Sequence, residues 1–351
     1  MYLTLFLITV TDNLIKITTL TLLCLNVLGC SVSGTKTIPD SSPESQSIAI
    51  EKPTWENIAI KSFAGHDNSI WSVAISPKQN LIATASEDNS IKIWNARTGE
   101  LITTLTGHNS GVLSISFNPL GKEIASSSKK GIIKIWHLET GASRSIKASE
   151  KAVRSLVFSP DGTKIINSSW DNTIKIWNAK NGELIHNLTA HSEGIFAVAV
   201  SSDNKLIASV SKDKTIKIWD LNKGTLIRSI AGHDDNIRTV AFSPDNKEIA
   251  TGSVDRTIKL WDVKTGNLIN TLSGHSEYIN SVAFHPDGKT LVSAGKDRTI
   301  KLWDLKTGKI IRSLSGSKAA INSVIFTPDG NSLISGSAAD DSKLRIWQNQ
   351  N

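Results

Sequence analysis

Histidine offers the widest chemistry of any residue type in this chain, because a neutral imidazole can bind a metal or act as a general acid or base. The sequence contains eight histidines among its 351 residues. Five of them recur at one position of a repeated segment: His66, His108, His191, His233 and His275. The other three, His137, His186 and His285, stand singly, whereas metal ligands must converge on one point. We therefore expect no metal site and assign the five recurring histidines a structural role.

Other catalytic side chains are equally scarce in the sequence. The chain has two cysteines, Cys24 and Cys30, so residues 31–351 contain no disulfide framework and no thiol nucleophile. The motifs G-x-G-x-x-G, G-x-x-x-x-G-K-[ST], H-E-x-x-H and G-x-S-x-G are missing. The aspartates fall at turn positions of the repeat. We therefore predict no catalytic residues, no cofactor and no enzymatic activity.

The element that positions these residues is a repeat of about 42 residues. Its best copy is TGSVDRTIKLWD, residues 251–262, and each of the seven copies ends on a tryptophan: Trp94, Trp136, Trp177, Trp219, Trp261, Trp303 and Trp347. Within one unit, alternating apolar runs such as Ile237 to Phe242 are separated by turn residues such as Ser243 to Asn246. No segment has the apolar spacing of a sizeable helix. A period of 40 to 45 residues with a Trp-Asp ending is typical of four-stranded propeller blades.

These features together resemble the WD-repeat β-propeller family over residues 58–347. The resemblance implies an all-β, seven-bladed propeller of four-stranded antiparallel blades. In that family a His, a Ser or Thr, the turn Asp and the Trp form a hydrogen-bonded row that ties one blade together. Four copies match the row in full: His66, Thr84, Asp88, Trp94; His191, Ser209, Asp213, Trp219; His233, Thr251, Asp255, Trp261; and His275, Ser293, Asp297, Trp303.

Three copies depart from this row. The second copy keeps His108 and Ser126 but has Lys130 in place of the Asp, and the third has Ser149 and Asn167 in place of the His and Ser. The seventh has Ser317 in place of the His, and two extra residues before Asp341 are expected to push that carboxylate outward. We therefore expect packing, more than polar contacts, to hold these three blades.

The chain before the repeat divides into two segments. Residues 1–29 contain an apolar run from Ile17 to Gly29 that is too short to span a bilayer and suits the core of a signal peptide. Its end, Val27-Leu28-Gly29-Cys30, resembles the lipobox of bacterial lipoproteins, in which the Cys is lipidated and becomes the new N-terminus. Residues 30–54, rich in Ser, Thr and Pro, cannot build a core and are predicted to form a flexible tether. The alternative is a buried strand or an uncleaved anchor in place of the signal peptide.

The propeller is predicted to occupy residues 55–351 and to close through its two ends. The chain stops soon after Trp347, which ends a third strand, so the last blade lacks a fourth strand of its own. The N-terminal strand Ile58 to Phe63 is expected to supply it, which removes two open sheet edges. A ring with few open edges is expected to be monomeric.

The resemblance also indicates a binding face, at the loops before the first strand and between the second and third. The positions that point there are Trp71, Glu87, Leu113, Lys129, Arg154, Trp170, Phe196, Lys212, Asn236, Arg238, Val254, Tyr278, Asn280, Lys296 and Asn322. Trp, Tyr and Arg dominate the energetics of protein interfaces. The predicted partner-binding face is therefore made of Trp71, Arg154, Trp170, Phe196, Arg238 and Tyr278. The alternative for each aromatic residue is ordinary packing within its blade.

The net charge of +7 does not indicate nucleic-acid binding. Each copy carries one basic residue two positions before its Trp: Lys92, Lys134, Lys175, Lys217, Lys259, Lys301 and Arg345. These seven sites are spread evenly round the ring and cannot form the single basic stripe that nucleic acid requires. We therefore predict a non-catalytic scaffold for other proteins, lipid-anchored through Cys30 in a bacterial cell envelope. Two alternatives are a cytoplasmic scaffold with an uncleaved N-terminus and an envelope propeller that is an enzyme or small-ligand binder at the channel mouth.

Overall fold

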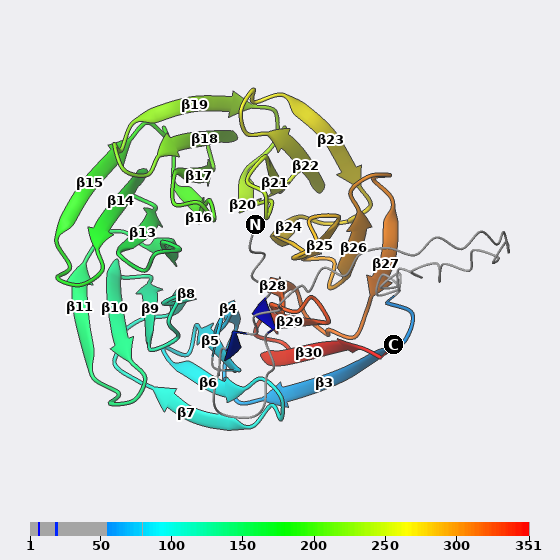
Figure 1. Ribbon diagram of the computed structural model, residues 1–351, viewed down its shortest axis with the longest axis horizontal. Coiled ribbons are helices and arrows are strands. Elements are labelled where there is room, and N and C mark those ends of the chain that lie inside the picture. Colours follow the sequence, from blue (N-terminus) through cyan, green and yellow to red (C-terminus); the bar gives the residue numbers. More distant parts are fainter. Residues whose placement is uncertain (1–5, 8–17, 20–54, 79, 351) are drawn as a thin grey trace, which may run out of the picture. The chain divides into compact units, whose positions relative to one another are not determined.

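The structure, a computed structural model, describes residues 6–7, 18–19, 55–78 and 80–350. Its contacts divide the chain into two units, Met1–Ile50 and Glu51–Asn351. In the first unit β1 (Phe6–Leu7) pairs antiparallel with β2 (Thr18–Thr19). The predicted signal peptide and tether, including Cys30, otherwise lie outside the described residues. The second unit is all-β and forms seven four-stranded antiparallel sheets arranged as the blades of a propeller, which confirms the predicted fold (Figure 1).

Each blade uses four strands, and Figure 1 shows them in order from the axis of the ring to its circumference. The innermost strands are β4 (Ile70–Ile75), β8 (Val112–Phe117), β12 (Val153–Phe158), β16 (Ile195–Val200), β20 (Ile237–Phe242), β24 (Ile279–Phe284) and β28 (Ile321–Phe326). The second strands are β5 (Leu81–Ser86), β9 (Glu123–Ser128), β13 (Lys164–Ser169), β17 (Leu206–Ser211), β21 (Glu248–Ser253), β25 (Thr290–Gly295) and β29 (Ser332–Ser337). The third strands are β6 (Ile91–Asn95), β10 (Ile132–His137), β14 (Thr173–Asn178), β18 (Thr215–Asp220), β22 (Thr257–Asp262), β26 (Ile300–Asp304) and β30 (Lys343–Asn349). The outermost strands are β7 (Leu101–Leu105), β11 (Ser143–Lys147), β15 (Leu184–Thr189), β19 (Leu226–Ala231), β23 (Leu268–Ser273), β27 (Ile310–Leu314) and, in the last blade, β3 (Ile58–Ala64).

The ring closes between its first and last strands. β3 pairs antiparallel with β30 in seven consecutive positions, from Ile58 opposite Asn349 to Ala64 opposite Lys343. Trp55, just before β3, is buried and meets the ring of Phe326 edge-on at 6.1 Å between centroids. The strand order β28-β29-β30-β3 confirms that the N-terminal strand completes the last blade.

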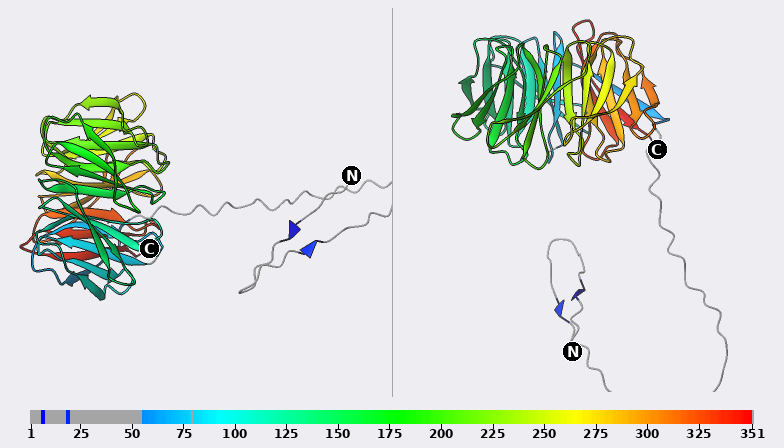
Figure 2. Two further views of the ribbon diagram at one scale, coloured as in Figure 1. Left: turned by 90° about the vertical axis from the view of Figure 1, so that its left-hand side faces the viewer. Right: turned by 90° about the horizontal axis from the view of Figure 1, so that it is seen from above.

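The apolar core lies between blades. Each of the seven apolar clusters combines residues of two neighbouring blades, and the tryptophan of one blade packs on its neighbour; Trp136, for example, joins a cluster with Ile91 and Ile93. The second and third strands contribute most of the fully buried side chains, since both of their faces are covered. Seen edge-on in Figure 2, the strands run from one face of the ring to the other. Blade-to-blade contact therefore supplies the hydrophobic stabilisation, at roughly 25 cal/mol per Å² of apolar surface.

Every innermost strand carries a β-bulge near its start. In β4, Ile70 pairs with Ser86 and Ser72 pairs with Ala85, so that Trp71 between them has no partner. The same shift occurs in the other six blades. A bulge re-aims the side chain of its extra residue. The seven bulged residues are Trp71, Leu113, Arg154, Phe196, Arg238, Asn280 and Asn322.

The residue after the bulge joins one blade to the next at five junctions. Its hydroxyl accepts a hydrogen bond from a backbone N–H of the following innermost strand, as Ser323 does from Val73 at 3.2 Å. The other four bonds run from Leu156 to Ser114, Val198 to Ser155, Val282 to Thr239 and Val324 to Ser281. These bonds fix the innermost strands relative to one another and so fix the spacing of the bulged residues.

Candidate binding site at one mouth of the ring

The four complete polar rows are assembled by the structure in the same geometry. In blade five the Nδ1 of His233 lies 2.7 Å from Asp255 Oδ2, its Nε2 lies 2.8 Å from Thr251 Oγ1, and Trp261 Nε1 donates to the same hydroxyl at 2.9 Å. Blades one, four and six repeat these contacts within 0.1 Å. A carboxylate can only accept, so it holds the imidazole with its proton on Nδ1, and the hydroxyl then donates to Nε2. The histidine side chains are fully covered, so none is free to act on a substrate.

The carboxylates of these rows are held ionised. Burial alone would raise the pKa of Asp297. Hydrogen bonds donated by His275 and Thr299 outweigh this effect and lower the pKa to about 2. The pKa values of Asp88, Asp213 and Asp255 are lowered for the same reasons. A row therefore supplies one fixed negative charge to its blade at neutral pH.

The three incomplete rows differ from one another. In blade two His108 and Trp136 share the hydroxyl of Ser126, but Lys130 provides no carboxylate. Burial and the charge of Lys134 lower the pKa of His108 to about 4, so this imidazole stays neutral at physiological pH. Of the three, blade two best fits the expectation that packing replaces polar contacts.

Blades three and seven correct that expectation, because each builds a substitute row around a cation. Asp171 accepts from Ser149 at 2.8 Å and pairs with Lys175 at 2.8 Å. In blade seven Asp341 was predicted to be pushed outward, and this is wrong. Its side chain is 1% exposed and accepts from Ser317 at 2.9 Å and from Arg345 at 2.6 Å. The insertion at Ala338 to Asp340 is absorbed by the loop, whose Ala339 N–H donates to Ser69 of blade one.

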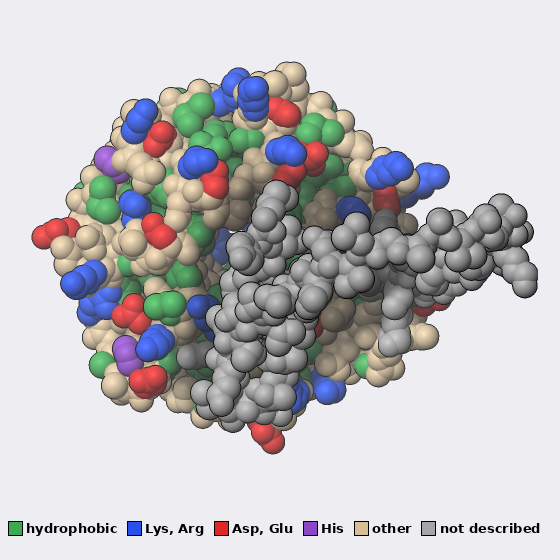
Figure 3. Space-filling model, viewed as in Figure 1, with side chains coloured by type: hydrophobic (Ala, Val, Ile, Leu, Met, Phe, Trp, Pro, Cys, Tyr) green, Lys and Arg blue, Asp and Glu red, His purple; other side chains and the backbone are tan. Residues whose placement is uncertain are grey.

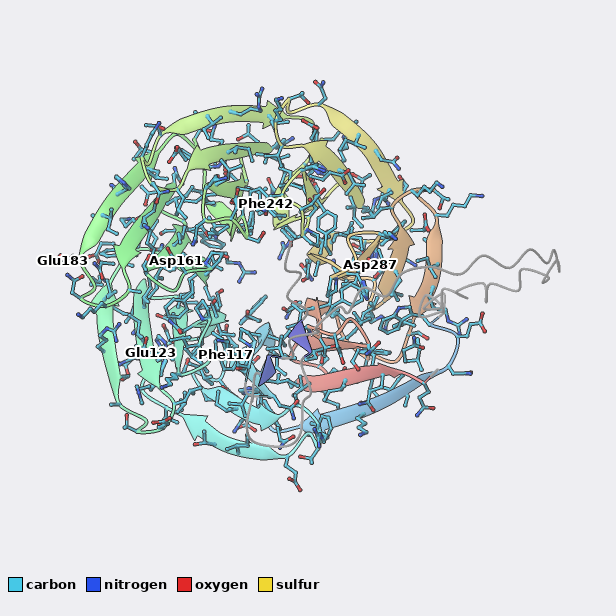
Figure 4. The ribbon with its side chains drawn as sticks, in the orientation of Figure 1. Phe117, Glu123, Asp161, Glu183, Phe242 and Asp287 are labelled. Atoms are coloured by element: carbon cyan, nitrogen blue, oxygen red, sulfur yellow. The ribbon has the colours of Figure 1, made fainter. Side chains whose placement is uncertain are left out.

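The bulged residues encircle the axis at one face of the ring. They lie at the opposite ends of the innermost strands from Phe117 and Phe242, which Figure 4 labels near the ring centre, whereas Glu183 lies at the circumference. Two of the seven are tied to backbone: Asn280 donates to the Ile321 carbonyl at 3.1 Å and Asn322 to the Ile70 carbonyl at 3.0 Å. The other five line a hollow of about 690 Å³ together with Lys129, Lys151, Ala152 and Trp170.

We define the mouth as the surface formed by seven residues of blades one to six: Trp71, Leu113, Arg154, Trp170, Phe196, Arg238 and Tyr278. All six residues of the predicted partner-binding face belong to it. The guanidinium carbon of Arg154 lies 4.8 Å from the centroid of the Trp71 ring, although the two come from blades three and one. The Trp71 indole donates to Glu87 at 2.8 Å, and Glu87 also pairs with Lys129 of the next blade. The structure thus brings Trp71 and Arg154 together across blade two.

The second part of the mouth centres on Phe196. Trp170 meets it edge-on at 6.4 Å, and the guanidinium of Arg238 lies 5.3 Å from its centroid and 4.7 Å from that of Tyr278. The ammonium nitrogen of Lys296 lies 5.1 Å from the centroid of the same Tyr278 ring. Trp170 is 49% exposed, so it is not a core residue, whereas Phe196 and Tyr278 are half-buried. Aromatic faces attract cations, which explains how two arginines remain there without a carboxylate.

Among the described residues, neither Arg154 nor Arg238 has an ion pair or a hydrogen bond. Burial lowers the pKa of Arg154 to about 10, and the neighbouring charge of Arg238 acts in the same direction while Glu87 opposes it. Burial also lowers the pKa of Arg238. Arg154 therefore keeps its charge at neutral pH, in surroundings that disfavour an unpaired cation and favour a bound anion.

A second hollow of about 480 Å³ adjoins the first. Both are lined by Lys151, Trp170 and Phe196, and the second adds polar residues of blades three to five: Asn172, Ser192, Glu193, Lys212 and Asn236. Gly194 also lines the second hollow. The Trp170 ring packs closely against it, since a Cβ at position 194 would lie 3.2 Å from that ring. The indole of Trp170 thus borders both hollows, which form one groove from the axis outward.

Two features of the mouth were not predicted. Lys151 lies outside the positions that the repeat points at this face, so no sequence signal marks it. The bulge is the second; it places the buried residues Ile237 and Val240 three positions apart, which breaks the period of two that a regular strand shows. A further signal was present in the divergence of the bulged position between copies, whereas four of the seven copies keep the complete polar row.

Two other kinds of site were searched for in the part of the chain that the structure describes. Within residues 55–78 and 80–350 no group of three or more His, Cys, Asp and Glu side chains could hold a metal ion. Nor does the described part of the chain contain a helix long and apolar enough to cross a bilayer. On the part of the face that Figure 3 leaves uncovered, acidic and basic side chains are interspersed and do not form one basic stripe.

Comparison with known proteins agrees with this architecture. Residues 127–294 match the family described as the WDR36/Utp21 second beta-propeller domain. Residues 58–95, 99–137 and 308–348 match the family described as the WD domain, G-beta repeat. The chain therefore contains WD repeats and a WD-repeat β-propeller domain.

Curated relatives match over about one repeat. A eukaryotic translation initiation factor 3 subunit I of Neosartorya fischeri is 44% identical over 41 residues, which cover 12% of this chain and 12% of that protein. A probable cytosolic Fe-S cluster assembly factor of Schizosaccharomyces japonicus is 55% identical over 42 residues, which cover 12% of this chain and 7% of that protein. The chain thus spans only about an eighth or less of the length of these relatives.

Proposed function

We propose that this protein is a non-catalytic scaffold that binds other proteins at the mouth of its propeller. The observation that carries the proposal is the mouth itself, where four aromatic rings and two arginines without carboxylate partners lie at one open groove. Aromatic and arginine side chains in a partly desolvated hollow are the residues that dominate protein interfaces. The WD repeats support the same function, since propellers built from them commonly bind proteins.

The absence of a catalytic arrangement in the described residues is consistent with this function. The five recurring histidines are covered and engaged in rows, and the mouth contains neither a nucleophile with a base beside it nor a paired set of carboxylates. A rigid ring with a varied mouth can hold a partner in a fixed position without changing it.

Photo-cross-linking from Trp170 tests the scaffold. Trp170 is replaced by benzoylphenylalanine in the full chain, and the native source is irradiated. We expect a discrete protein adduct, because this side chain is exposed at the edge of both hollows. The matched control places the cross-linker at Leu226, which is 43% exposed on the outermost strand of blade four. Equal adducts from both positions, or none from position 170, would contradict binding at the mouth.

We further propose that the scaffold is lipid-anchored in a bacterial cell envelope. The support is the sequence before the propeller, where an apolar run ends in Gly29-Cys30 and a polar segment rich in Ser and Thr follows. Several acyl chains on Cys30 would anchor the protein stably. Intact-mass spectrometry of protein recovered from native membranes should show a chain that begins at Cys30 and carries acyl mass, and Cys30→Ala should abolish it. An unprocessed chain in the soluble fraction would instead favour a cytoplasmic scaffold.

A further inference from the structure

The two arginines of the mouth lack the carboxylate partner that two cations of the polar rows have. Arg345 is paired with Asp341, and Lys175 is paired with Asp171. Arg154 and Arg238 lie over aromatic rings, and within the described part of the chain neither donates a hydrogen bond. A guanidinium presents five N–H donors in a fixed fork that matches a carboxylate. Two such guanidinium groups that line one hollow offer a position at which a carboxylate of a partner could accept several hydrogen bonds.

The carboxylates near the mouth are already engaged and cannot supply that partner. Glu87 accepts from Trp71 and pairs with Lys129. Glu193 pairs with Lys212 at 2.9 Å, and Glu277 lies 3.8 Å from Lys296. Each of these three acids is thus balanced by a lysine, and the uncompensated charge at the two hollows comes from the two arginines and from Lys151, which has no ion pair within the described residues.

We propose that the mouth binds an extended acidic segment of a partner protein, with a carboxylate between Arg154 and Arg238 and an adjacent apolar side chain against Trp170. This inference rests on the proposed scaffold function and specifies what the scaffold recognises. Charge complementarity requires the acid, and the wall of Leu113, Ala152 and Phe196 favours an apolar neighbour.

The length of the groove favours a peptide chain over a small acid. The carboxylate position lies in the first hollow, whereas the second hollow, beyond Trp170, is lined by Asn172, Ser192 and Asn236. Amide and hydroxyl side chains of this kind can pair with a peptide backbone. A small carboxylic acid bound in the first hollow would leave the amide and hydroxyl side chains of the second hollow without a ligand.

Selection of displayed peptides on the purified full chain tests the proposal. A random library of 12-residue peptides is selected on the wild-type protein, on the double variant Arg154→Gln, Arg238→Gln, and on the control Lys223→Gln, Lys264→Gln. The control removes two charges from turns between third and fourth strands, at the other face of the ring. The charge-preserving variant Arg154→Lys, Arg238→Lys is included in case the glutamine variant unfolds, which its thermal melt reports.

Wild type and control should enrich peptides that carry Asp or Glu next to an apolar residue, and the glutamine variant should not. For one selected peptide we expect affinity to fall about 10- to 100-fold in the glutamine variant, the equivalent of one or two charged hydrogen bonds. The lysine variant should retain the acidic preference. Added NaCl should weaken binding to the wild type, because part of the attraction is between charges that solvent can reach.

Three results would overturn the inference. The first is that the wild type enriches peptides without a preference for Asp or Glu. The second is that the glutamine variant enriches the same acidic peptides as the wild type. The third is displacement of a selected peptide by an equal concentration of succinate, which would assign the mouth to a small acid. If no peptide is enriched but position 170 still cross-links to a protein, the proposal of an acidic segment is wrong and the proposed scaffold function is retained. If neither occurs, the proposed function fails as well.

Discussion

Blade seven and the mouth each contain partly buried arginine, and they treat it in opposite ways. Arg345 is buried against Asp341, which in turn is held by Ser317, so both of these buried charges have a partner inside the blade. Arg154 and Arg238 lie against aromatic rings and face an open groove. Tryptophan shows the same contrast: the seven row tryptophans are buried and donate to Ser, Thr or Asn, whereas Trp170 is 49% exposed.

This contrast separates stability from binding in the molecule. Four of the seven copies keep the complete row, and the row side chains hydrogen-bond within their own blade, so their contribution is to the free energy of unfolding. The bulged positions hold Trp, Leu, Arg, Phe and Asn, and the two arginines among them have neither a hydrogen bond nor an ion pair within the described residues. Substitutions should therefore divide cleanly, with row variants losing stability and mouth variants losing binding.

The largest loss of stability is expected from Trp261→Ala. The side chain is buried in the cluster shared by blades four and five and donates to Thr251. Its removal should lower the free energy of unfolding by about 3–5 kcal/mol, measured by urea denaturation. Trp170→Ala is the matched control at the mouth. Similar urea midpoints for the two variants would break the proposed division between rows and mouth.

Removal of a row carboxylate should cost less, and the cost should depend on what it leaves behind. Asp255→Ala leaves the fully covered His233 with an N–H that has no acceptor, at about 1–3 kcal/mol. Asp171→Ala leaves Lys175, whose side chain is 13% exposed and can extend its ammonium to water. We therefore expect the larger shift of the urea midpoint for Asp255→Ala. A larger shift for Asp171→Ala would show that the substitute row is the stronger one.

Blade two predicts a pH dependence of stability. The pKa of His108 is lowered by burial to about 4 in the folded chain and is close to 6.5 when unfolded. The unfolded chain therefore binds this proton first, and stability is lost as the pH falls from 6.5 towards 4, by about 1–2 kcal/mol between pH 7 and 5. Lys130→Asp should supply the missing carboxylate and flatten this part of the stability curve. An unchanged slope would remove His108 as its cause.

The smallest change in stability is expected from Trp170→Ala itself, within about 0.5 kcal/mol, because half of the side chain is exposed. Its effect should appear in binding. With benzoylphenylalanine at Tyr278, the yield of the cross-linked partner should fall when Trp170 is also replaced by alanine. Full yield together with a large loss of stability would place Trp170 with the rows instead of the mouth.

Much of the fold could be predicted from the sequence, because the tryptophan spacing, the turn residues and the missing fourth strand of the last blade all follow from local patterns. The strand Ile58 to Ala64 closes the ring as expected. The place of Asp341 could not be predicted, since it depends on how a loop absorbs two residues and on Arg345, which resembles any other basic residue of the third strands. A repeat pattern describes what its copies share, and Asp341 is held by what one copy does differently.

The six predicted face residues were found by their position in the repeat, but their mutual contacts were not. Arg154 reaches Trp71 across a whole blade, and no pattern along the chain indicates that pairing. The bulges that aim these side chains leave a trace in the sequence, since buried residues such as Ile279 and Val282 stand three positions apart, but that spacing does not show which side chains meet. The unsatisfied state of Arg154 and Arg238 is a property of three-dimensional surroundings and has no sequence signal.

The pairing of β3 with β30 has a consequence for synthesis on the ribosome. β3 emerges first, whereas its partner is made only after about 280 further residues, roughly 15–60 s later at 5–20 residues per second. Throughout that interval its strand edge is exposed to other nascent chains, the situation that favours aggregation. Lys61 and Ser62, in the middle of an otherwise apolar IAIKSFA strand, place a charge and a hydroxyl on it. A charge within an edge strand disfavours its pairing with another chain, so Lys61 should lower this risk until the ring closes.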